Sequence, residues 1–182
     1  MLTHKMLSHA LNDENAGPTG GAHGDQKGYE LCCCPWYSYP WIAVYRPVSG
    51  VKGDGMARFM EAAVANGYIG YDQDLELRKE TIAWLADHDY DVSRMNGNHC
   101  VDCSALVYAA VLSQYGIGYS GKGVADTVPK TWHFDEYLME ILTPADPGGG
   151  FEKLTDSSCL DSADSLIRGD ILLADGHVAI WI

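Results

Sequence analysis

The sequence predicts an α+β domain, and two observations support that prediction. Segments with the apolar spacing of amphipathic helices gather in the middle of the chain, and the chain finishes with two apolar β-type runs joined by the turn sequence ADG. The helical segments precede this hairpin and do not alternate with strands one by one, which is typical of α+β rather than α/β proteins. A length of 182 residues suits a single domain with a buried core.

The first part of the chain is predicted to be an irregular lead-in followed by two strands. Residues 1–28 are rich in Gly, Asn and His and contain GPTGG, so we expect no regular structure there and place the domain at 29–182. The runs YELCCC (29–34) and WIAVYR (41–46) are rich in aromatic and β-branched residues. Because PWYSYP separates them, we expect two strands joined by a proline-bounded turn.

Four segments carry helix signals ahead of the final hairpin. DGMARFMEAAVANG (54–67) has apolar residues at helical spacing, and DQDLELRKETIAWLADHD (72–89) begins with acidic residues, which suit the positive end of a helix dipole. DCSALVYAAVLSQYG (102–116) is apolar on most sides, which predicts a central helix. The fourth segment is VPKTWHFDEYLMEIL (128–142). RGDILLADGHVAIWI (168–182) is predicted to be an antiparallel hairpin, because a short turn joins its two runs.

Charge and hydropathy argue against two classes of partner. The net charge is −13 and no stripe of Lys and Arg appears, so we expect no binding to nucleic acid, which needs clustered cations. No stretch approaches the roughly 20 apolar residues of a membrane span, and the opening residues lack the apolar core of a secretory signal peptide. Three of the six cysteines are consecutive, which makes a poor disulfide framework. We therefore expect mostly free thiols and synthesis in a reducing compartment.

Cys103 and His177 are the candidate catalytic residues. Cys103 would begin the central helix with Asp102 as its N-cap, where the helix dipole and free N–H groups favour a thiolate and can stabilise an oxyanion. A cysteine nucleophile needs a base within hydrogen-bond reach, and His177 opens a predicted strand directly after a tight turn. Each residue alone has an ordinary structural explanation, as a buried thiol or a surface histidine. Their two contexts together favour catalysis.

These two blocks resemble the NlpC/P60 branch of the papain-like cysteine peptidases, which cut bacterial peptidoglycan. The resemblance rests on DCSALV (102–107) and GDILLADGHVAIWI (169–182). GDQKGYEL, WYSYPWIAVYRP, NGYIGYDQ and GGGFEKLTDSSCLDSADSLIRGDIL are similar to parts of phage-encoded lysins of this type, so the resemblance covers roughly residues 20–182. It implies a papain-like fold in which the helix with the nucleophile packs on a small antiparallel sheet.

The resemblance implies roles for three residues of the two blocks. Cys103 matches the nucleophile of the family, and its backbone N–H would form part of the oxyanion hole. His177 matches the general base. Ser104 follows the cysteine as in the family motif and is a candidate for the oxyanion or substrate site.

The remaining positions of the family pattern are less well matched. The tyrosine that the family has upstream of the cysteine corresponds to Tyr71, with Tyr68 as the alternative, and Gln26 is another candidate oxyanion donor. The family also has a polar residue that orients the histidine, on the strand after it. This sequence ends five residues past His177 and does not include that strand, so either the natural protein is longer or another residue orients the histidine. Asp25 and Asp72 are the candidates for that role. Without an orienting group we expect weak activity.

Two other uses of the cysteines compete with catalysis. Cys100 and Cys103 form a C-x-x-C motif, which also occurs in zinc and redox sites. A zinc site would need further ligands from Cys32 to Cys34 or from His99, and three consecutive thiols converge poorly on one metal. A thioredoxin-type motif follows a strand, whereas MNGNHC is polar and turn-like. We therefore expect neither a metal nor an organic cofactor.

A non-catalytic wall-binding module is the alternative from another class of protein. Trp36, Tyr37, Tyr39 and Trp41 could stack on carbohydrate, or they could pack a β-hairpin against the core. We favour a monomeric hydrolase that cuts an amide bond in the peptide part of peptidoglycan, either within the stem peptide or, as an amidase, at its link to the sugar. Such a protein would be made in the cytoplasm of a phage-infected bacterium or carried in a virion.

Overall fold

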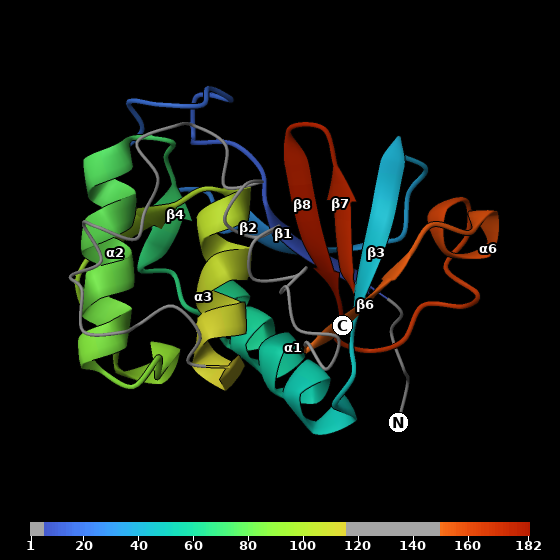
Figure 1. Cartoon of the computed structure of the whole chain (residues 1–182). Helices are drawn as coiled ribbons and strands as arrows, with labels where there is room; N and C mark the ends of the chain where they lie inside the picture. The colour runs from blue at the N-terminus through green and yellow to red at the C-terminus, as the bar shows by residue number, and fades with distance from the viewer. Residues whose placement is uncertain (1–5, 116–149) are drawn as a thin grey trace.

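The computed structural model describes residues 6–115 and 150–182, and a six-stranded sheet organises them. Its strands, in chain order, are β1 (Met6–Ala10), β2 (Leu31–Pro35), β3 (Trp41–Pro47), β6 (Phe151–Leu154), β7 (Ile171–Ala174) and β8 (His177–Trp181). Their order across the sheet is β2-β1-β8-β7-β3-β6, and each neighbouring pair is antiparallel (Figure 1). The sheet therefore places the first described strand directly beside the last.

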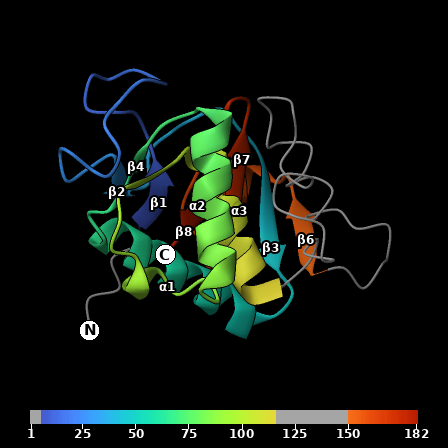
Figure 2. The same ribbon diagram turned by 90° about the vertical axis from the view of Figure 1, so that its left-hand side faces the viewer.

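Four helices of the described residues complete the α+β fold. They are α1 (Gly50–Ala65), α2 (Leu75–Asp87), α3 (Cys103–Tyr115) and the short α6 (Ser157–Leu160), and Val92–Arg94 forms the 3-10 turn η1. Figures 1 and 2 show α3 between α2 and the sheet, with α1 crossing the same side. All of α3 from Cys103 to Leu112 is buried, because helices and sheet enclose it on every side.

Apolar side chains alternate between two cores, one on each face of the sheet. Val178 and Ile180 of β8 pack with α1, α2 and α3, whereas Ala179 and Trp181 belong to a second cluster with Trp41 and neighbours near α6. This alternation follows from the two-residue period of a strand. Both faces of the central strands are therefore covered, which explains why β7 and β8 read as continuous apolar runs.

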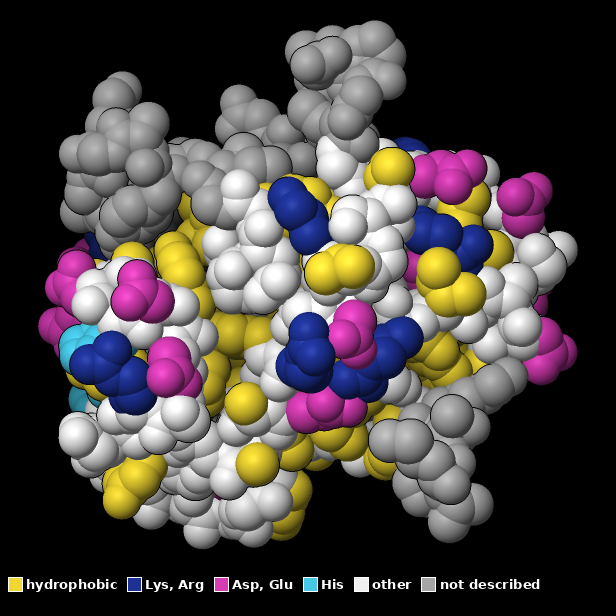
Figure 3. Space-filling model, turned by 90° about the horizontal axis from the view of Figure 1, so that it is seen from below, with side chains coloured by type: hydrophobic (Ala, Val, Ile, Leu, Met, Phe, Trp, Pro, Cys, Tyr) yellow, Lys and Arg dark blue, Asp and Glu magenta, His cyan; other side chains and the backbone are white. Residues whose placement is uncertain are grey.

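Ion pairs connect the base of the final hairpin to the helices and sheet. The Arg168 guanidinium lies 2.8 Å from carboxylate oxygens of both Asp54 and Glu61 on α1, and Arg46 of β3 binds the fully buried Asp170. Acidic and basic side chains lie close together on the face seen from below (Figure 3). No broad patch of a single sign is visible on that face.

The predicted helices over 54–67, 72–89 and 102–116 and the predicted final hairpin are confirmed. The predicted helix over 128–142 lies outside the described residues. The sheet is larger than the small one expected, because it also contains β1 and β6, which the sequence did not predict.

Three expectations about strands were wrong. The lead-in expected to be irregular contains β1, whose buried Ser8 and His9 hide its strand character from hydropathy. β2 and β3 do not form a hairpin, since β1, β8 and β7 lie between them. The segment expected to be turn-like before the central helix contains β5 (His99–Val101), which pairs in parallel with β4 (Ile69–Tyr71).

Candidate active site

The start of α3 is held by a buried cap. The Asp102 carboxylate accepts hydrogen bonds from the backbone N–H of Ala105 at 2.7 Å and from the Ser104 hydroxyl at 2.8 Å. The predicted N-cap is therefore confirmed, and the Ser104 hydroxyl is engaged in it. Arg78 of α2 forms an ion pair with the same carboxylate, and the two side chains are 3% and 6% exposed. Cys103, the first residue of α3, is thus fixed at a rigid helix end with 9% of its surface exposed.

His177 begins β8 directly after the turn of the final hairpin. Gly176 in that turn has a φ of +71°, a backbone conformation that glycine adopts without strain. The imidazole packs against Tyr39 and Trp41, with ring centroids 5.5 and 5.9 Å away. The aromatic segment that separates β2 from β3 therefore encloses the histidine.

A second histidine, His9 of β1, lies against His177. The Nδ1 atom of His9 is 2.9 Å from Nε2 of His177, a hydrogen-bond distance between residues 168 positions apart in the chain. The Tyr37 hydroxyl lies 3.4 Å from the former nitrogen and 3.3 Å from the latter. On its other side, Nε2 of His9 is 3.4 Å from the sulfur of Cys34. These contacts form a continuous polar chain in which the Tyr37 hydroxyl touches both imidazoles.

Both imidazoles are neutral near pH 7. Burial, followed by the charge of His177, lowers the pKa of His9 to about 4, and burial lowers the pKa of His177 to about 4. A hydrogen bond between two neutral imidazoles needs a proton on one of the two facing nitrogens and a lone pair on the other. If that proton is on Nε2 of His177, its Nδ1 carries a lone pair and can act as a base.

Cys103 and His177 lie at the same end of the fold. Figure 1 shows α3 beginning at the end of the sheet where the β7–β8 hairpin turns, and α3 packs on β8. Cys103 belongs to the core cluster beneath α3, whereas the His177 ring points toward Trp41 and the second cluster. Tyr37 is influenced by groups on both sides. Burial raises the pKa of its hydroxyl to about 12, and the Cys34 thiol and, to a smaller extent, the Cys103 thiol add to that rise.

The three candidate oxyanion donors lie in different surroundings. Tyr71 is buried on β4, accepts a hydrogen bond from Gln73, and has a pKa raised first by burial and also by Cys103, which indicates that its hydroxyl lies near the thiol. Tyr68 is 46% exposed. The Gln26 side chain donates to backbone carbonyls of His23 and Gly24 within its own exposed loop. Tyr71 is thus buried on a strand, whereas Tyr68 and Gln26 are exposed.

The groups considered for orienting His177 bind elsewhere. Asp25 accepts hydrogen bonds from backbone N–H groups of its own loop, and Asp72 does so from Gly20 and Asp74. The side chain that lies at hydrogen-bond distance from Nε2 of His177 is His9. His9 was not among the predicted site residues, because the composition of residues 1–28 indicated no regular structure there. The available signal was the alternation in LSHA, which carries a histidine on the same face as Leu7.

The C-x-x-C pair is divided between two elements. Cys100 is 1% exposed in β5, where burial raises its pKa to about 11, and Cys103 begins α3. Such a raised pKa disfavours the thiolate that redox chemistry and metal binding require. In the part of the chain that the structure describes, no group of three His, Cys, Asp or Glu side chains is placed to hold a metal ion.

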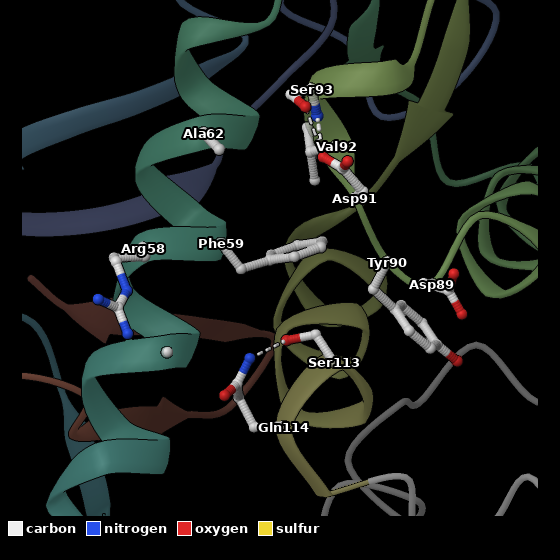
Figure 4. Close-up of a pocket in the computed structure, with 11 residues that line it drawn as sticks. Arg58, Phe59, Ala62, Asp89, Tyr90, Asp91, Val92, Ser93, Ser113 and Gln114 are labelled. Atoms are coloured by element: carbon white, nitrogen blue, oxygen red, sulfur yellow. Dashed lines mark hydrogen bonds between the residues drawn. The ribbon is translucent and has the colours of Figure 1, made fainter.

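Two hollows lie apart from the histidine pair. One, of about 290 Å³, lies between α1, η1 and the end of α3 and is lined by residues that include Arg58, Phe59 and Tyr90 (Figure 4). The other, of about 430 Å³, is lined by side chains of β3 and β7 together with Lys153 and Asp175. Neither is lined by Cys103, His177 or His9.

Fold and site together define an α+β protein with a thiol at the start of a buried helix and a buried imidazole pair at the same end of the sheet. A family model for the endolysin-like domain matches residues 7–182, and the chain belongs to this family. Membership suggests a phage protein with a lytic function on the bacterial cell wall and peptidoglycan as its substrate. No curated protein and no solved structure gives a significant match. Among the described helices, none combines the length and apolar character needed to cross a membrane.

Proposed function

We propose that the chain is a cysteine peptidase or amidase with a papain-like NlpC/P60-type fold, which cleaves an amide bond in the peptide part of peptidoglycan. Cys103 is the nucleophile and His177 the general base. The observation that supports the proposal is the buried histidine pair, in which Nε2 of His177 faces His9, so the proposal assigns the other ring nitrogen, Nδ1, to the thiol. Family membership supplies the cell wall as the substrate.

The reaction is an acyl transfer through a thioester. Nδ1 of His177 takes the thiol proton as the Cys103 sulfur bonds to the amide carbonyl carbon, and backbone N–H groups at the start of α3 stabilise the oxyanion. His177 then gives that proton to the amine nitrogen, and the C–N bond breaks. Water attacks the thioester while His177 accepts one of its protons. The carboxylic acid leaves, and the proton returns to the Cys103 sulfur.

His9 serves as the positioning residue for this base. Its Nδ1 accepts the Nε2 proton of His177, which holds the ring orientation and disperses charge when His177 is protonated. In this proposal β1 supplies an orienting group for the histidine. β1 pairs with β8, the strand that His177 begins.

Digestion of purified cell wall tests the proposal. Wild-type protein is expected to create new amine and carboxyl termini, which mass spectrometry locates within the stem peptide or at its link to the sugar. Cys103→Ala should abolish their release, and Cys33→Ala, a matched control on β2, should retain it. Equal release by wild type and Cys103→Ala would overturn the proposal. Binding of both proteins to wall without cleavage would favour a wall-binding module.

Thiol alkylation tests the pairing of Cys103 with His177 without substrate. Iodoacetamide should modify Cys103 more slowly in His177→Ala than in wild type at pH 7, because the base that takes the thiol proton is gone. The same rate in both proteins would contradict the pairing.

A further inference from the structure

Cys34 continues the polar chain beyond the two histidines. In the antiparallel pairing of β1 with β2, His9 is opposite Cys32 and Leu7 is opposite Cys34, so His9 and Cys34 share one face of the sheet. The Cys34 sulfur is 3.4 Å from Nε2 of His9. Cys33 is opposite Ser8 in the register and therefore points to the other face. Of these two neighbouring thiols, only Cys34 therefore meets the histidine pair.

The direction of the hydrogen bonds decides whether His177 can act as a base. In one arrangement, Nε2–H of His177 donates to Nδ1 of His9, and Nε2–H of His9 donates to the Cys34 sulfur. In the reverse arrangement, the thiol donates to His9, His9 donates to His177, and the His177 proton is on Nδ1. Only the first leaves a lone pair on Nδ1 of His177.

We propose that Cys34 is a positioning residue whose sulfur accepts the Nε2 proton of His9 and so holds both imidazoles in the tautomer with Nδ1 free. An S–H group is a weak donor and an imidazole N–H a strong one, so the arrangement with sulfur as acceptor makes the better hydrogen bonds. The Tyr37 hydroxyl lies 3.4 Å from Nδ1 of His9 and 3.3 Å from Nε2 of His177, so it can accept from whichever of these nitrogens carries the proton and is compatible with both arrangements. The catalytic consequence rests on the proposed function, but the tautomers do not.

Nitrogen-15 NMR of histidine-labelled protein at pH 7 tests the tautomers directly. His9→Gln and His177→Gln variants assign the two rings among the seven histidines. In wild type both rings should carry their proton on Nε2. Cys34→Val removes the acceptor at similar volume and should move His9 toward the Nδ1–H form. Cys34→Ser, which restores an acceptor, should return the wild-type signals, and Cys33→Val should leave them unchanged.

Kinetics provide the second readout. Cys34→Val should lower kcat by about tenfold with little change in KM, because a smaller fraction of the enzyme holds the productive tautomer, and Cys34→Ser should recover most of the loss. A wild-type His9 protonated on Nδ1, or tautomers unchanged in Cys34→Val, would overturn the proposal. Where Cys34→Val does not fold, the wild-type spectrum still tests the proposal, because a proton on Nδ1 of His9 would overturn it. The spectrum of Cys103→Ala separates the two proposals, since the tautomers should survive there although hydrolysis does not.

Discussion

At the scale of single residues, the central feature is the pair of neutral imidazoles, which the surrounding side chains keep buried. His9 is 1% exposed and His177 is partly buried, so neither is readily protonated at neutral pH. The proposed mechanism needs His177 in this neutral form, because a protonated imidazole cannot accept the thiol proton. The surrounding rings of Tyr39 and Trp41 exclude water and so maintain the low pKa.

His9→Phe removes the acceptor for the His177 Nε2 proton while it keeps an aromatic ring in β1. We expect kcat for wall hydrolysis to fall by about 10²- to 10⁴-fold, as when other catalytic histidines lose their orienting partner. His9→Gln offers an amide oxygen and should recover part of the loss. His88→Gln, a change at the half-buried C-cap of α2, where the ring stacks on Trp84, is the control and should retain activity. Unchanged kcat in a folded His9→Phe protein would exclude the positioning role.

At the scale of elements, the junction of α2 and α3 determines where Cys103 lies. Arg78 and Asp102 join the two helices through an ion pair that is almost completely buried, and Asp102 also caps α3. Removing one member of a buried pair leaves the other charge without compensation in a medium of low polarity, which costs more than the pair itself contributes.

Arg78→Met therefore should reduce the free energy of unfolding by about 3 kcal/mol or more, measured by urea denaturation. Lys79→Met on the same helix is the matched control. Its ion pair with Glu76 is solvent-exposed on the glutamate side, so the loss should stay below about 1 kcal/mol. Losses of equal size in the two variants would show that burial does not determine the strength of the pair.

The elements that the sequence predicted are those specified by local pattern. α3 and the β7–β8 hairpin follow from apolar runs bounded by a capping aspartate or a short turn. The pairing of β1 with β2 and β8 depends on contacts between distant segments, which periodicity does not reveal. The same reason applies to the site. Cys103 and His177 can be recognised from the residues next to them in the sequence, namely a helix start and a hairpin turn. His9 lies beside His177 only because β1 pairs with β8 in the folded sheet.

At the scale of the whole molecule, the sheet brings the two ends of the described chain together. β1 is inserted between β2 and β8, so residues near the start lie against a histidine five residues from the end of the sequence. The two imidazoles can meet only in the folded sheet. Their pKa values therefore differ between the folded and unfolded chain, and global stability must depend on pH through them.

The sign of that dependence follows from the lowered pKa values. Between pH 6.5 and about 4, the unfolded chain binds protons at His9 and His177 that the folded chain does not, so stability falls as the pH is lowered through this window and is fully present above it. One histidine shifted from 6.5 to about 4 corresponds to about 3 kcal/mol. Urea denaturation at pH 7 and pH 4.5 should show this loss, and a His9→Phe/His177→Phe double variant should lose less over the same interval. An identical slope in both proteins would mean that other groups cause the acid sensitivity, because the variant has neither imidazole left to protonate.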